Sequence, residues 1–173
     1  MSQTSYLMDG DKKQWTLPNA AQAVKTGSVM TWITRKAVRG EDADDWAIFN
    51  AYVDADNYIA MFGNKNANTV TARYRVGGTN YDVTFTPDAW TVNSWIDVGC
   101  SWSAPNGYLR AYWEGAEVGT AILLPTAIST ASATLYQNWI DSTKPLFGLM
   151  DQFLFYQVQM PAADFARYTT ARF

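Results

Sequence analysis

The chain has 173 residues, enough for one domain with a full core, and its 48% hydrophobic and 15% aromatic content excludes a disordered polymer. It contains no histidine and one cysteine, which excludes Ser-His-Asp and Cys-His catalysis, histidine metal ligands and an intramolecular disulfide. The net charge of −3, without a basic cluster, argues against a nucleic-acid partner. We expect the lone Cys100 to be a small buried apolar group.

Neither a secretory signal nor a membrane-spanning segment is predicted. The first 15 residues lack a basic region followed by a long apolar run, and no apolar run in the chain approaches 18 residues.

Apolar residues recur with a period of two along most of the chain, which is typical of β-strands. The last expected strand is almost continuously apolar, so we expect it inside a sheet. Residues 120–145 have the weakest pattern and are expected to form loops with short strands. In chain order, the expected strands and hairpins cover residues 27–36, 45–53, 57–62, 69–85, 94–102, 108–115 and 146–160.

Residues 69–85 give the clearest hairpin signal. Gly77 and Gly78 supply the two positive-φ positions of a two-residue turn, which fixes the register. The Arg73–Asp82 pair is expected to be solvated and to contribute at most about 1 kcal/mol. On one face the predicted pairs are Val76 with Thr79, Tyr74 with Tyr81 and Val70 with Phe85; on the other they are Arg75 with Asn80, Arg73 with Asp82 and Thr71 with Thr84.

The C-terminal segment changes character after Met160. Pro161 suits the first turn of a helix, and Asp164 suits its positively polarised N-terminal region. We expect a short helix there, with Phe165 facing the body. The pattern as a whole predicts an all-β sandwich of roughly a dozen strands closed by one helical turn.

Four segments in chain order carry a family resemblance: YLMDGDKKQWTLP, TGSVMTWITRK with Trp32 at its centre, SWIDVGCSW followed by YLRAYWEGAEVG, and FGLMDQFLFYQVQMPAADFARY. Together they resemble the concanavalin A-like lectin/glucanase superfamily in its laminin G-like branch. The first resembles that family's opening strand pair, and the last resembles its closing strand and helix. The resemblance implies a two-sheet antiparallel jelly-roll sandwich with one short C-terminal helix, forming a single domain over residues 1–173.

Two glutamates, Glu114 and Glu117, flank Gly115 and could be an acid/base pair or the tip of a hairpin. A retaining glycosidase needs two carboxylates about 5 to 5.5 Å apart in a cleft. The hydrolase branch of the superfamily places them in an E-x-D-x-x-E or E-x-D-x-E strand motif, which this sequence lacks. The resemblance places both glutamates at a solvated hairpin tip, so we expect a non-enzyme.

The resemblance also suggests a structural calcium site. Asp9, Gly10 and Asp151 match positions where members of this fold often hold Ca²⁺, whose usual shell has about 6 to 8 oxygen ligands. The alternatives are that Asp9 caps its own turn and that Asp151 bonds backbone amides. No other cofactor is expected.

Three loops combine aromatic rings with amide or carboxylate groups, the combination that binds sugars by stacking and hydrogen bonding. The alternative is that the aromatic residues fill the core and the acidic loop is only solvated. The candidate ligand-binding residues are Asp44, Asp45 and Trp46, then Asn64 and Asn66, then Asn138 and Trp139.

Because the fold serves many functions, the functional hypothesis rests on what the chain lacks. Laminin G-like domains usually belong to secreted, disulfide-bearing proteins, and this chain has neither a signal pattern nor a disulfide. By analogy, we expect a non-catalytic bacteriophage virion protein, such as a capsid decoration protein, head fibre or tail adhesin, made in the host cytoplasm. It would bind other virion proteins or copies of itself, and host glycans. The alternatives are a cellular lectin or carbohydrate-binding module and, third, a divergent glycoside hydrolase.

Overall fold

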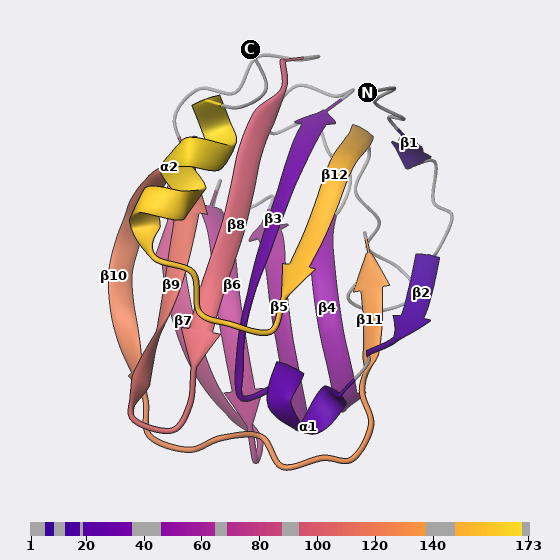
Figure 1. Ribbon diagram of the computed structural model, residues 1–173, viewed down its shortest axis with the longest axis vertical. Coiled ribbons are helices and arrows are strands. Elements are labelled where there is room, and N and C mark those ends of the chain that lie inside the picture. The colour runs from indigo at the N-terminus through magenta and orange to yellow at the C-terminus, as the bar shows by residue number, and fades with distance from the viewer. Residues whose placement is uncertain are drawn as a thin grey trace.

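The computed structural model describes residues 6–8, 13–17, 19–35, 46–64, 69–87, 94–137 and 148–170. Two six-stranded antiparallel sheets lie face to face (Figure 1). In spatial order, sheet A consists of β1 (Tyr6–Met8), β12 (Gly148–Tyr156), β3 (Thr26–Arg35), β8 (Ile96–Ser103), β9 (Gly107–Trp113) and β10 (Ala116–Leu124). Sheet B consists of β2 (Lys13–Thr16), β11 (Thr134–Gln137), β4 (Trp46–Asp54), β5 (Asn57–Asn64), β6 (Thr69–Val76) and β7 (Thr79–Phe85). This architecture confirms the predicted jelly-roll sandwich.

The β6–β7 hairpin has the predicted register at every pair. Gly77 and Gly78 have φ of 54° and 80°, the left-handed values that a two-residue turn of this kind requires. Arg73 binds Asp82 through two hydrogen bonds of 2.7 and 2.8 Å, as the cross-strand pairing predicts.

The core fills the space between the sheets with aromatic and aliphatic side chains. Phe49 of β4 stacks on Trp102 of β8 with ring centroids 6.4 Å apart, which joins the two layers. Cys100 is fully buried, and this burial raises the pKa of its thiol. Its predicted role as a small apolar core residue is confirmed.

Helix α2 (Ala162–Thr170) lies on the outer face of sheet A (Figure 1). Phe165 is 1% exposed and stacks on Tyr112 of β9 at a centroid distance of 3.6 Å. Gly99 of β8 lies beneath Phe165, and a Cβ at this position would clash with the Phe165 ring and the Val29 carbonyl. A glycine in β8 therefore permits the close approach of the helix.

Two expectations are corrected by the structure. The opening strands do not pair with each other, because β1 joins β12 in sheet A whereas β2 joins β11 in sheet B. A second helix, α1 (Ala20–Ala23), precedes β3, and its single turn was too short to show a periodic pattern.

Candidate functional site

Most sequence-predicted site residues lie outside the described residues: Asp9, Gly10, Asp44, Asp45, Asn66, Asn138 and Trp139. Of the others, Trp46 is the first residue of β4 and Asn64 is the last residue of β5. Asp151 lies within β12.

The strand ends that flank these predicted positions meet at one end of the sandwich. Trp46 lies opposite Gly63, next to Asn64, so the start of β4 adjoins the end of β5. β11 also ends there, since its last residue, Gln137, lies opposite Phe49 (Figure 1). Segments that are far apart in sequence thus leave the sheet at neighbouring points.

Asp151 is buried on the α2 side of sheet A. It pairs in register with Trp32, whose ring contacts Tyr168 of α2 at 5.9 Å. The described residues include no group of three or more acidic or cysteine side chains close enough to hold a metal ion. The calcium site at Asp9, Gly10 and Asp151 therefore stays a prediction.

Glu114 and Glu117 occupy different positions. Glu114 and Gly115 form the turn between β9 and β10, with φ of 50° and 75°, and Glu114 is exposed as predicted. Glu117 is not at the tip: it lies on β10 and accepts hydrogen bonds of 2.6 and 2.8 Å from Arg110 Nη1. An exposed turn residue and an ion-paired strand residue are not the arrangement of an acid/base pair in a cleft.

The outer face of sheet B carries a band of half-buried aromatic side chains, which we call the aromatic face: Tyr52, Tyr58, Phe62 and Tyr136. Tyr52 and Tyr136, from adjacent strands β4 and β11, meet edge to face at 6.3 Å. Tyr52 lies opposite Tyr58 of β5 in the ladder. The band thus crosses three neighbouring strands.

Charged groups of β6 and β7 border the aromatic face. The Arg73 guanidinium lies 5.1 Å from the Phe62 ring centroid, and Arg75 lies 6.0 Å from that of Tyr58. The hydrogen bonds from Arg73 to Asp82 raise the pKa of Arg73 and balance its charge. Aromatic rings beside rigid polar groups suit an uncharged polar ligand that has one apolar side.

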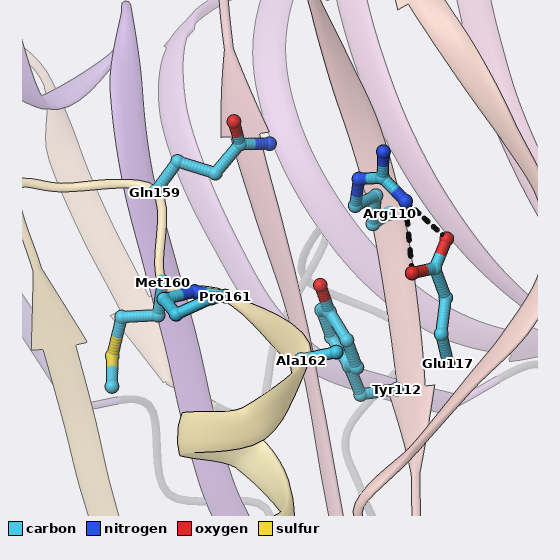
Figure 2. A pocket seen from close by; sticks show the side chains of 7 residues that line it. All are labelled: Arg110, Tyr112, Glu117, Gln159, Met160, Pro161 and Ala162. Atoms are coloured by element: carbon cyan, nitrogen blue, oxygen red, sulfur yellow. Dashed lines mark hydrogen bonds and ion pairs between the residues drawn. The ribbon is translucent and has the colours of Figure 1, made fainter.

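A groove lies on sheet A beside the start of α2 (Figure 2). This groove has a volume of about 360 Å³. Strands β9 and β10 form one wall, and the connection from β12 to α2 forms the other. Its lining residues are Arg110, Tyr112, Glu117, Gln159, Met160, Pro161 and Ala162.

The sequence analysis selected neither surface. Alternation along β4 and β5 could have placed Tyr52 and Tyr58 outward, but β11 becomes their neighbour only through sheet order. The two walls of the groove are more than 40 residues apart in sequence, and no local pattern indicates that they meet.

A laminin G domain model of the concanavalin A-like lectin/glucanases superfamily matches residues 9–166. The chain belongs to this superfamily. The sequence resemblance is thereby confirmed, together with the fold that it implied. No curated protein sequence matches the chain.

Solved structures with this superfamily fold are similar to the chain at low sequence identity. A heptameric pentraxin from Limulus polyphemus is 15% identical with a TM-score of 0.65, over 86% of this chain and 71% of that one. Domain 4 of AbnA, an extracellular GH43 arabinanase from Geobacillus stearothermophilus solved with arabinotriose, is 19% identical with a TM-score of 0.66, over 89% and 71%.

The receptor-binding domain of botulinum neurotoxin mosaic serotype C/D is 14% identical, with a TM-score of 0.74. The match covers 97% of this chain but only 41% of that domain. This chain therefore spans about two fifths of the length of the neurotoxin domain. At these identities the likeness shows the fold alone. None of the helices among the described residues has the length and apolar character needed to cross a bilayer.

Proposed function

We propose that the chain is a non-catalytic glycan-binding domain and that its aromatic face is the binding surface. The observation that carries this proposal is the band of Tyr52, Tyr136 and Tyr58 across three strands, with fixed polar groups beside it. A sugar ring would stack its C–H face on a tyrosine while its hydroxyls bond the neighbouring amide, carboxylate and guanidinium groups.

Two structural neighbours support a glycan as the ligand. The AbnA domain was solved with arabinotriose, and a botulinum neurotoxin DC binding domain, with a TM-score of 0.66, was solved with SialylT.

The state of the carboxylates supports a binding role over hydrolysis. Glu117 and Asp82 are each tied to an arginine, and Asp97 accepts hydrogen bonds from Thr169 and the Gly115 amide. A general acid must be positioned to donate its proton into a cleft beside a second carboxylate. These three are committed to structural partners instead.

The test is a glycan array probed with the wild-type chain, Tyr52→Ala and Tyr136→Ala. We expect each substitution to weaken binding at the aromatic face at least about tenfold, since buried aromatic anchors dominate such interfaces. Tyr156→Ala, which removes an exposed tyrosine from sheet A, is the matched control and should bind as the wild type does. Trp46→Ala and Trp139→Ala test whether the candidate loops predicted from the sequence also contribute to binding. A blank array, or unchanged binding by both tyrosine variants, would refute the proposal.

The narrower setting of a bacteriophage virion stays a prediction from the sequence. Copies of the chain or other virion proteins as partners also stay predictions, as does the alternative of a cellular lectin. The proposed glycan site is compatible with each of these settings.

A further inference from the structure

The groove beside α2 is held rigid by hydrogen bonds that join its two walls. Gln159 Nε2 donates to the carbonyl oxygen of Tyr108 at 2.8 Å, which ties the β12–α2 connection to β9. Ser28 of β3 fixes the same connection, because its hydroxyl bonds the Val158 carbonyl and the Met160 amide, both at 2.8 Å. A ligand would therefore meet a preorganised surface, which lowers the entropic cost of binding.

Polar groups of the groove keep unused hydrogen-bonding capacity among the described residues. Arg110 reaches Glu117 through Nη1 alone, which leaves its Nε–H and Nη2 groups as donors. Gln159 uses its nitrogen for Tyr108, which leaves Oε1 as an acceptor. The Tyr112 hydroxyl is buried and lies 3.5 Å from Ser101 Oγ, so it supports the floor of the groove and is not a donor for a ligand.

The groove has no net formal charge to attract an ion. Its charged lining residues, Arg110 and Glu117, neutralise each other. Asp164 in the first turn of α2 opposes the positive end of that helix. The carboxylates of Glu117 and Asp164 would repel an anionic ligand, and the guanidinium of Arg110 would repel a cationic one.

Apolar atoms complete the lining. Pro161 and Ala162 supply exposed apolar atoms to one wall, whereas the Met160 side chain points away from the opposite wall (Figure 2). The volume of about 360 Å³ falls at the lower end of the range of ligand pockets, roughly 300 to 1,000 Å³. An uncharged ligand with paired donors and acceptors on one side and C–H groups on the other fits all of these properties.

We infer that the groove is a second binding site, specific for a neutral saccharide unit, on the sheet opposite the aromatic face. Arg110 and Gln159 would bond the sugar hydroxyls, and Pro161 and Ala162 would cover its apolar side. Together with the proposed function, this would make the chain bivalent. The groove site does not depend on the aromatic face.

The experiment is a calorimetric titration of the full chain with the neutral oligosaccharide that gives the strongest array signal. The groove variant combines Arg110→Met with Glu117→Gln, which removes both charges together and so leaves no charge without its partner. Gln159→Met is an independent second variant. Melting temperatures close to that of the wild type establish that each variant is folded.

We expect the wild type to bind two oligosaccharides per chain. The groove variant and Tyr52→Ala should each lose a different one, with at least about tenfold weaker binding at the altered site. An unchanged isotherm for both groove variants would overturn the inference while leaving the aromatic face intact. Loss of all binding in the groove variant alone would instead support the groove and refute the aromatic face. Absence of binding in the wild type would overturn both.

Discussion

At the scale of single residues, Tyr74 joins three distant parts of the chain. Its ring is fully buried, and its hydroxyl donates to the Val24 carbonyl at 3.0 Å and accepts from the Ile128 amide at 2.8 Å. Burial raises the pKa of Tyr74 to about 12. The predicted hairpin register placed Tyr74 on the same face as Val70 and Val76. Its partners could not be predicted, because they lie 50 and 54 residues away in sequence.

Tyr74→Phe should lower the free energy of unfolding by about 2 kcal/mol at pH 7, since it leaves two buried backbone groups without partners. The pKa of Tyr74 is higher in the folded chain, so its contribution is complete below pH 10 and is lost between pH 10 and about 12. Urea unfolding across this range should show the difference between wild type and variant shrinking with pH. Equal stability at pH 7, or a difference that stays constant to pH 12, would contradict this role.

At the scale of elements, α2 is fastened to sheet A by one carboxylate as well as by Phe165. Asp97 of β8 is 2% exposed, and its Oδ2 accepts from Thr169 at 2.7 Å and from the Gly115 amide at 3.0 Å. Burial raises the pKa of Asp97, whereas the hydrogen bond from Thr169 opposes that rise. The helix thus stabilises the ionised form of a buried acid.

Thr169→Val should therefore destabilise the chain more at pH 7 than at pH 3. At pH 7 the variant keeps an ionised Asp97 with one donor fewer, at a cost of about 1 to 3 kcal/mol. At pH 3 Asp97 is protonated and the loss is smaller. Unfolding at both pH values, each compared with the wild type, measures the effect. Thr170→Val is the matched control, because Thr170 is exposed and its hydroxyl bonds only the Arg167 carbonyl among the described residues. A loss independent of pH would argue against the Asp97 contact.

Elements differed in how well the sequence predicted them, for reasons of length and turn chemistry. The β6–β7 hairpin was predicted to the residue because Gly77 and Gly78 fix its turn. The assignment of β1 and β2 to different sheets was not predicted, because strands of three and four residues are too short to show a clear alternation of apolar and polar residues. Helix α2 was predicted from Pro161 and the change in composition.

At the scale of the whole molecule, two surfaces lie on opposite outer faces of one sandwich. The fold was predictable because alternation and the order of four motifs agree with a single architecture. The aromatic face and the groove could not be predicted from the sequence. The aromatic face depends on β11 lying beside β4, and the groove depends on where the β12–α2 connection crosses sheet A. Both depend on contacts between segments that are distant in sequence.

The most direct test of glycan binding at the aromatic face is NMR titration of the isotopically labelled groove variant, which removes the second site, with the same oligosaccharide. We expect the perturbed resonances to belong to β4, β5 and β11, with Tyr52, Tyr58 and Tyr136 shifting most. Perturbations confined to sheet A and α2, or no perturbation at saturating oligosaccharide, would contradict it.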